Sequence, residues 1–248
     1  MINKNELIEI SKLMGLKPWQ QEKHYIQYMV LNSIADMPII FKGGTYLWFA
    51  HGLNRFSEDL DFTASGGIKN NIANIVSRNL DLFGVENTIK VIADNDITNS
   101  FRISAKGPLN TGKIDECVVY VEISKRESIL KDTIAVKLDY PAYSLPIKII
   151  AGMALGEVGA EKVRAILTRQ KARDIYDLYY LISKKNIRFD EPAVNLKLNY
   201  YKMVFSKTKF IERINVMQNT YVKELNGLIY GELPKFTDVI KCIQKWIK

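Results

Sequence analysis

Residues 42–45 read KGGT, and residues 55–62 read RFSEDLDF. The first stretch is a small-residue turn of the kind that lets a backbone approach a phosphate, because glycine tolerates positive φ and has no Cβ. The second stretch places Asp59 and Asp61 two residues apart, so on an extended strand both carboxylates point to the same face. Neighbouring carboxylates repel each other unless a cation lies between them, and Mg²⁺ prefers such oxygen ligands. Together the two stretches indicate a metal site that handles a nucleotide.

Each half of this signal also has a plain structural explanation. A tight turn with Thr45 as the N-cap of a helix accounts for the glycines about as well as phosphate binding does. Asp59 and Asp61 are equally compatible with the solvated end of a strand. The combination favours the functional interpretation, because the carboxylate pair lies on a second strand shortly after a strand–turn–helix unit.

Glu122 is a candidate third metal ligand. It lies in the apolar stretch 117–123, CVVYVEI, which is typical of a strand. A lone acid in a buried strand is costly unless a cation neutralises it. The alternative is an exposed strand end at which Glu122 pairs with Lys125 or Arg126.

A second charged cluster follows in the C-terminal part of the chain. Asp174 and Asp177 are three residues apart and share one helix face, and Lys162 and Arg169 share a face if their helix is continuous. In a functional interpretation the basic groups bind phosphates, while an acid holds a lysine or accepts a proton from an attacking hydroxyl. The alternative is a set of surface ion pairs worth about a few tenths of a kcal/mol each.

Net charge, cysteine and histidine content and hydropathy limit the kinds of site and partner expected for this protein. The 248 residues carry a formal net charge of +8, which is compatible with a polyanionic partner, although lysine-rich surfaces also serve solubility. Two cysteines and two histidines support neither a zinc site nor a Ser-His-Asp triad, and the cysteines are expected to be free thiols. With no signal-peptide pattern and no membrane-length apolar run, we expect a cytoplasmic protein without a membrane partner.

The periodicity predicts a mixed α/β half at residues 1–150 and an all-helical half at residues 151–248. In the first half, helices are expected at 4–14, 18–37, 45–50 and 70–82, and strands at 38–41, 60–63, 87–92, 100–105, 117–123, 133–138 and 145–150. In the second half, helices are expected at 161–169, 172–183, 191–201, 209–228 and 235–247.

In order and spacing, residues 38–181 resemble the AbiEii/AbiGii-type nucleotidyltransferases. These belong to the DNA polymerase β-like nucleotidyltransferase superfamily and include toxins of toxin–antitoxin and abortive-infection systems. Four motifs carry the resemblance: residues 42–62, residues 121–124 (VEIS), residues 155–169 and residues 173–178 (RDIYDL).

The resemblance implies an α+β fold, with a nucleotidyltransferase-type mixed sheet and flanking helices followed by a C-terminal helical bundle, and a nucleotide in the cleft between them. It implies that Asp59, Asp61 and, less directly, Glu122 hold Mg²⁺ or Mn²⁺. The implied nucleotide-binding residues are Gly43, Gly44, Thr45, Arg55, Ser57 and Lys162. The implied catalytic residues are Asp59, Asp61, Lys162 and a fourth-motif acid, either Asp177 or Asp174.

The implied reaction moves a nucleoside monophosphate from an NTP to an acceptor hydroxyl. With a basic surface, RNA such as tRNA is the expected acceptor, and a cognate antitoxin is a candidate partner. Two alternatives stay open: a small-molecule nucleotidyltransferase of the antibiotic-modifying kind, and a nucleotide-binding regulatory module without turnover.

Overall fold

The computed structural model describes residues 1–68, 71–112 and 114–248 and contains two compact units. The first unit comprises Met1–Tyr46, Glu58–Arg126 and Thr133–Gly152. The second comprises Leu47–Ser57, Glu127–Asp132 and Met153–Lys248. Two short segments from the N-terminal part of the chain therefore belong to the C-terminal unit.

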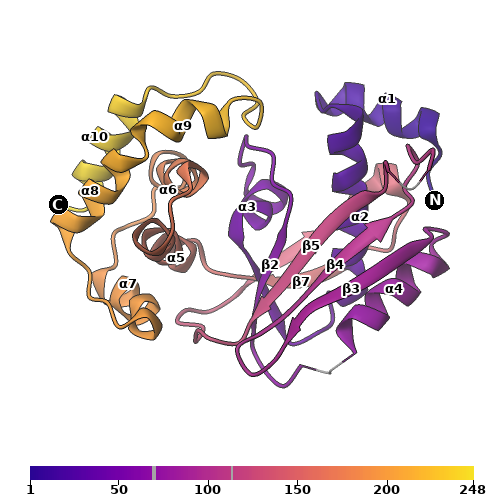
Figure 1. Ribbon diagram of the computed structural model, residues 1–248, viewed down its shortest axis with the longest axis horizontal. Coiled ribbons are helices and arrows are strands. Elements are labelled where there is room, and N and C mark those ends of the chain that lie inside the picture. The colour runs from indigo at the N-terminus through magenta and orange to yellow at the C-terminus, as the bar shows by residue number, and fades with distance from the viewer. Residues whose placement is uncertain (69–70, 113) are drawn as a thin grey trace. The chain divides into compact units, whose positions relative to one another are not determined.

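The first unit is built on a seven-stranded mixed sheet in the order β3-β4-β5-β2-β1-β7-β6. Its strands are β1 (Ile39–Lys42), β2 (Leu60–Ala64), β3 (Asn87–Asp94), β4 (Thr98–Ala105), β5 (Cys117–Ser124), β6 (Ile134–Leu138) and β7 (Lys148–Gly152). At the centre, β1 runs antiparallel to β2 and parallel to β7, while β2 runs parallel to β5 (Figure 1). The predicted mixed sheet is confirmed.

Burial along the strands follows their position in the sheet. All four residues of the central strand β1 are buried, as expected for a strand covered on both faces. In β5, Val119, Val121 and Ile123 are buried while Tyr120 and Glu122 between them are exposed. This two-residue alternation places Glu122 on the open face of the sheet.

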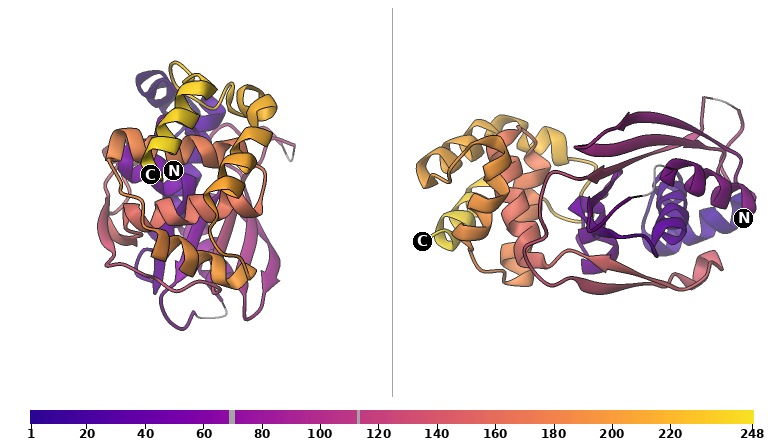
Figure 2. Two further views of the ribbon diagram at one scale, coloured as in Figure 1. Left: turned by 90° about the vertical axis from the view of Figure 1, so that its left-hand side faces the viewer. Right: turned by 90° about the horizontal axis from the view of Figure 1, so that it is seen from below.

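Three helices cover the sheet of the first unit: α1 (Lys4–Met14), α2 (Pro18–Ile34) and α4 (Ile72–Leu82). Figure 2 shows them together against one face of the sheet, where α2 contacts β5 and α4 contacts β3. A capping box between Asn3 and Glu6 starts α1. The 3₁₀ turn η1 (Pro141–Tyr143) also belongs to this unit. The predicted start of the α4 helix at residue 70 lies outside the described residues.

The second unit is a helical bundle, which confirms the predicted fold class. Its helices are α5 (Leu155–Thr168), α6 (Ala172–Lys185), α7 (Glu191–Leu198), α8 (Lys207–Val216), α9 (Gln218–Leu225) and α10 (Phe236–Trp246), with the 3₁₀ turn η2 (Asn199–Tyr201). Helix α6 packs against α5, α9 and α10, and α5 also contacts α7 and α8. None of the described helices has the length and apolar character needed to cross a membrane. Both cysteines are free.

Two helix predictions were wrong in detail. The single helix predicted at 209–228 is broken at Met217, whose backbone (φ −86°, ψ 1°) ends α8 and begins α9, near weak helix formers such as Asn219 and Thr220. Helix α5 begins at Leu155, six residues before the predicted start, and Gly159 inside it is a packing residue. A Cβ there would lie 2.4 Å from Cδ1 of Ile187.

Candidate active site

The turn from β1 into α3 (Gly43–His51) lies directly against the carboxylate of Asp61. Gly43 has φ +78°, a conformation that side chains other than glycine rarely adopt. A Cβ on Gly43 would lie 2.3 Å from Oδ2 of Asp61, which is closer than any real contact. Gly43 is therefore required both by the turn and by the position of the Asp61 carboxylate.

Thr45 joins this turn to the residue before β2. Its hydroxyl donates a 2.5 Å hydrogen bond to the backbone carbonyl of Asp59, and the side chain is fully buried. Thr45 is the third residue of α3, so it is not the N-cap considered above. Gly44, the second residue of α3, is also buried. The hydroxyl of Thr45 thus fixes the backbone that presents the first aspartate.

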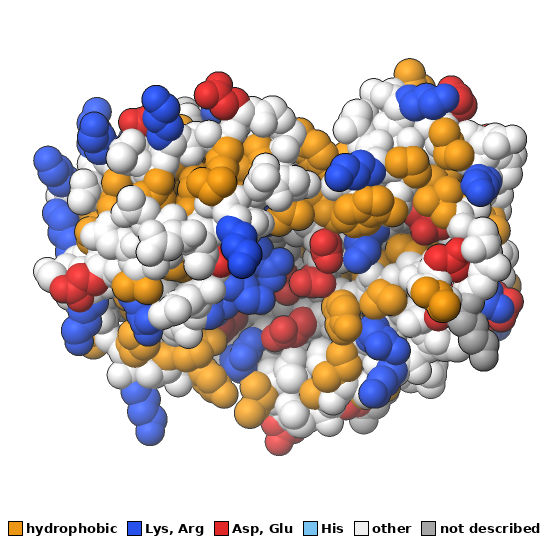
Figure 3. Space-filling view, turned by 45° about the horizontal axis from the view of Figure 1, so that its top comes forward, with side chains coloured by type: hydrophobic (Ala, Val, Ile, Leu, Met, Phe, Trp, Pro, Cys, Tyr) orange, Lys and Arg blue, Asp and Glu red, His pale blue; other side chains and the backbone are white. Residues whose placement is uncertain are grey.

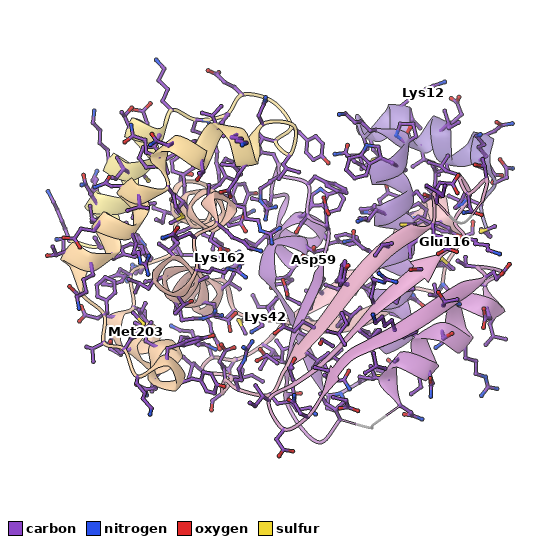
Figure 4. The ribbon with its side chains drawn as sticks, in the orientation of Figure 1. Lys12, Lys42, Asp59, Glu116, Lys162 and Met203 are labelled. Atoms are coloured by element: carbon purple, nitrogen blue, oxygen red, sulfur yellow. The ribbon has the colours of Figure 1, made fainter. Side chains whose placement is uncertain are left out.

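Asp59 and Asp61 flank the start of β2, and both are half-buried. On one side Asp61 faces Lys42 of β1 in register, and on the other it faces Glu122 of β5. Figure 4 shows Lys42 at the end of β1 and Asp59 just ahead of β2. The carboxylate oxygens of Asp59 and Asp61 are the donor type that a hard divalent cation requires. In donor type these two aspartates suit a metal ion, and their role as metal ligands stays a prediction.

Glu122 is bonded to a neighbouring arginine. Its Oε1 accepts a 2.9 Å hydrogen bond from Nη2 of Arg126, and 48% of its side chain is exposed. This is the ion pair that the sequence offered as an alternative. Among the described residues, no three His, Cys, Asp or Glu side chains gather as a metal-binding group. The role of Glu122 as a metal ligand stays a prediction.

In the second unit, Arg55 and Asp177 form a buried bidentate ion pair. Nε of Arg55 donates to Oδ1 of Asp177 at 2.8 Å and Nη2 donates to Oδ2 at 2.9 Å. Nη1 donates to the backbone carbonyl of Phe56 at 2.8 Å. The exposed fractions of the two side chains are 2% and 0%. The guanidinium of Arg55 is thus committed to holding its own segment against α6.

Lys162 extends this pair into a chain of alternating charges. Its Nζ lies 2.7 Å from Oδ2 of Asp177 and 3.0 Å from Oδ1 of Asp174, and Arg169 in turn donates to both oxygens of Asp174 at 2.8 and 2.9 Å. We call Arg55, Asp177, Lys162, Asp174 and Arg169 the charge network. All but Arg169 are buried, so the interpretation as surface ion pairs is wrong. Figure 4 shows Lys162 on α5.

The charge network keeps both of its acids ionised. Burial raises the pKa of Asp177, but Arg55 and Lys162 outweigh it and hold that pKa below its ordinary value. For Asp174, burial likewise raises the pKa, and Lys162 and Arg169 lower it further than burial raises it. The two carboxylates are therefore anions that fix the positions of three cations.

The predicted site residues fall into two groups. The first unit contains the turn Gly43–Thr45 together with Asp59, Asp61 and Glu122. The second contains Ser57, which is buried, and the predicted members of the charge network, namely Arg55, Lys162, Asp174 and Asp177.

The sequence did not predict the contact between the backbone of Arg55 and the segment that contains Ile229 and Tyr230. Arg55 forms an isolated β-bridge with Ile229, and the backbone N–H of Tyr230 donates to the carbonyl of Asn54 at 2.8 Å. The side chain of Asn54 returns a 3.1 Å hydrogen bond to the carbonyl of Tyr230. These backbone contacts join residues far apart in the chain, and no motif or spacing in the sequence predicts them.

Comparison with known proteins identifies structures with a similar fold and the family of the chain. The chain is similar to JHP933 from Helicobacter pylori, with a TM-score of 0.61 and 19% identity over 91% of this chain and 92% of that one. It is also similar to MenT4, a nucleotidyltransferase toxin from Mycobacterium tuberculosis, with a TM-score of 0.67 and 19% identity over 99% of this chain and 88% of that one. No match was found among curated proteins. The family model described as "Nucleotidyl transferase AbiEii toxin, Type IV TA system" matches residues 29–241. Since this match covers most of the sequence, the chain belongs to the AbiEii family of nucleotidyl transferase toxins.

Proposed function

We propose that this toxin-family nucleotidyltransferase moves a nucleoside monophosphate from an NTP to a hydroxyl of an RNA acceptor such as tRNA, with Mg²⁺ or Mn²⁺. The observation that carries the proposal is the turn at Gly43, which leaves room for the Asp61 carboxylate and for nothing larger than a hydrogen on its own Cα. A chain that only needed a tight turn would not require that close approach. A cognate antitoxin, as the family description implies, is the proposed protein partner.

In this proposal Asp59 and Asp61 hold the metal ion. When bound, such an ion orients the triphosphate and offsets the charge of the pyrophosphate leaving group. The acceptor hydroxyl attacks the α-phosphorus, the bond to the bridging oxygen breaks, and a carboxylate of the aspartate pair takes the hydroxyl proton. The backbone N–H groups at Gly43 and Gly44, at the start of α3, face the phosphates.

The charge network supplies positive charge for the nucleotide. We assign Lys162 the contact with phosphate, while Asp177 and Asp174 act as positioning residues because both are ionised and paired with cations. Arg55 is likewise a positioning residue, since its guanidinium is bonded to Asp177 and Phe56. Ser57 stays a predicted nucleotide ligand.

The test uses each of the four α-³²P-labelled NTPs with Mg²⁺, offered separately to total RNA and to a mixture of aminoglycosides. We expect label on RNA with the wild-type chain, and its loss with Asp59→Asn or with a chelator. Asp96→Asn, an exposed aspartate between β3 and β4, is the matched control and should keep full activity. Label confined to the aminoglycosides would establish the small-molecule alternative.

The same experiment separates catalysis from mere nucleotide binding. If the wild-type chain binds an NTP in equilibrium dialysis but labels no acceptor, the regulatory-module alternative stands and the proposed reaction fails. If Asp59→Asn labels RNA as well as the wild-type chain does, the assignment of the metal site fails instead.

A further inference from the structure

Helices α8 and α10 enclose a hollow lined mainly by lysines. Its volume is about 450 Å³, and its lining residues are Lys207, Ile211, Lys241, Gln244, Lys245 and Lys248. All four lysines are exposed. We call this feature the lysine hollow. Figure 3 shows Lys and Arg side chains standing along the edge formed by these C-terminal helices.

No Asp or Glu side chain in the lining balances these four charges. The lining contains no Asp or Glu, and within the described part of the chain none of the four lysines makes an ion pair. By contrast, two other lysines of the same unit are held in ion pairs. Lys131 lies 2.6 Å from Asp190, and Lys197 lies 2.6 Å from Glu157.

Two features of the placement of these lysines are unfavourable without a bound anion. Lys241 and Lys245 are four residues apart on α10, so two like charges share one helix face, and Lys248 lies just beyond the end of the helix. Lys207 is the first residue of α8, where the positive end of the helix dipole disfavours a cation. Both arrangements become favourable once an anion occupies the hollow.

We propose that the lysine hollow binds backbone phosphates of the acceptor RNA, an inference that rests on the proposed function. Four separate ammonium groups, three on α8 and α10 and one just after α10, match a string of phosphates better than a single small anion, because lysine binds phosphate as a point charge. Ile211 and Gln244 between them offer an apolar and a hydrogen-bonding surface for the sugars. The formal net charge of +8 adds long-range attraction for the same polyanion.

The test compares two full-length variants that lose the same number of charges. In the hollow variant, Lys207, Lys241, Lys245 and Lys248 become Gln. In the control variant, four exposed lysines of the same unit outside the hollow become Gln: Lys184, Lys209, Lys223 and Lys235. Binding of fluorescein-labelled tRNA, without NTP or metal, is measured by anisotropy from 50 to 300 mM KCl, with fluorescein-labelled polyglutamate as a second probe.

We expect the hollow variant to lose tRNA affinity at least tenfold at 100 mM KCl. The slope of log K against log salt should become shallower by about 3, as expected when four single-strand-type phosphate contacts are lost. The control variant should change the slope by less than 1. Equal losses in the two variants would overturn the proposal, because net charge alone would then explain the binding.

Two further outcomes separate this inference from its alternatives. If the hollow variant loses polyglutamate but keeps tRNA, the hollow serves an acidic protein and the RNA assignment is wrong. The binding assay contains no NTP and therefore does not depend on NMP transfer. A failure of this inference can thus be told apart from a failure of the proposed function. If the wild-type chain labels RNA but the hollow and control variants bind tRNA equally well, the proposed function stands and the inference about the lysine hollow is wrong.

Discussion

Gly43 is the residue on which the candidate metal site depends most directly. Replacing it with alanine strains a positive φ, which costs about 1–2 kcal/mol, and also drives a methyl group into Oδ2 of Asp61. Gly84 is a matched control, since it has φ +77° and open space around its Cα. We expect Gly43→Ala to lose NMP transfer and to unfold at lower urea concentration than Gly84→Ala. Equal midpoints with intact transfer in both variants would show that Asp61 has room to move.

His24 contributes to the pH dependence of stability in the first unit. It is buried, its Nδ1 lies 2.7 Å from the hydroxyl of Tyr143, and burial lowers its pKa from 6.5 to about 3. The unfolded chain therefore binds a proton below pH 6.5 that the folded chain does not. The unfolding free energy should fall by up to about 1.4 kcal/mol per pH unit from 6.5 towards 3.

Urea unfolding of His24→Gln between pH 4 and 7 checks this expectation. The variant should show a much flatter dependence on pH than the wild-type chain. A smaller slope of the same sign should persist from His51, whose pKa burial and Lys185 also lower. Parallel curves for the two proteins would mean that His24 takes up a proton without unfolding.

At this scale the sequence predicted residue types better than residue partners. The two-residue spacing argument put Asp59 and Asp61 on one strand, whereas Asp61 lies within β2 and Asp59 immediately precedes it. The bond from Thr45 to the Asp59 carbonyl depends on how a helix turns back over a strand, which no local pattern encodes. The same holds for Arg55, whose partner Asp177 lies 122 residues away.

At the scale of elements, α5 and α6 are joined through the charge network, and its members are not equivalent. Removing Lys162 leaves Asp177 with Arg55 and Asp174 with Arg169, so each buried acid keeps a cation. Removing the charge of Asp177 leaves the guanidinium of Arg55 buried without its carboxylate. Breaking a buried pair in this way costs about 3–5 kcal/mol.

We therefore expect Asp177→Asn to lower the unfolding free energy by about 3–5 kcal/mol and Lys162→Met to lower it clearly less. Lys162→Met should nevertheless lose most NMP transfer, because Lys162 is assigned the phosphate contact. Chemical denaturation and the RNA-labelling assay, run on both variants, measure the two effects. A Lys162→Met variant whose stability and activity fall together would reduce Lys162 to a structural ion-pair partner.

Helix boundaries show which element features the sequence could predict. Apolar periodicity located every helix of the second unit, because burial of one face decides it. The predicted start of α5 was six residues late, since Gly156 and Gly159, two weak helix formers, lie inside the helix. The break at Met217 was missed because Phe210, Ile214, Tyr221 and Leu225 keep a helical spacing across it.

At the scale of the whole molecule, the chain enters the second unit three times. Segments Leu47–Ser57 and Glu127–Asp132 join Met153–Lys248 there. The second of these is held by Glu157, whose carboxylate accepts hydrogen bonds from the backbone N–H groups of Leu130 and Lys131. A sequence argument from periodicity divides the chain once, near residue 150, and has no signal that would assign these two short segments to the C-terminal unit.

Because three separate segments build the second unit, we predict that residues 153–248 do not fold alone. The fragment lacks Arg55, which leaves Asp177 with Lys162 alone of its two cation partners among the described residues, and it lacks Leu53 and Phe56, which are fully buried. We expect the fragment to show helical circular dichroism but no cooperative thermal transition. Fusing residues 47–57 to it through a flexible linker should restore a transition, whereas a fused segment carrying Arg55→Gln should restore much less. A cooperative transition in the bare fragment would show that the helices of the second unit form a self-sufficient core, and that the buried pair of Arg55 and Asp177 serves the site and not the fold.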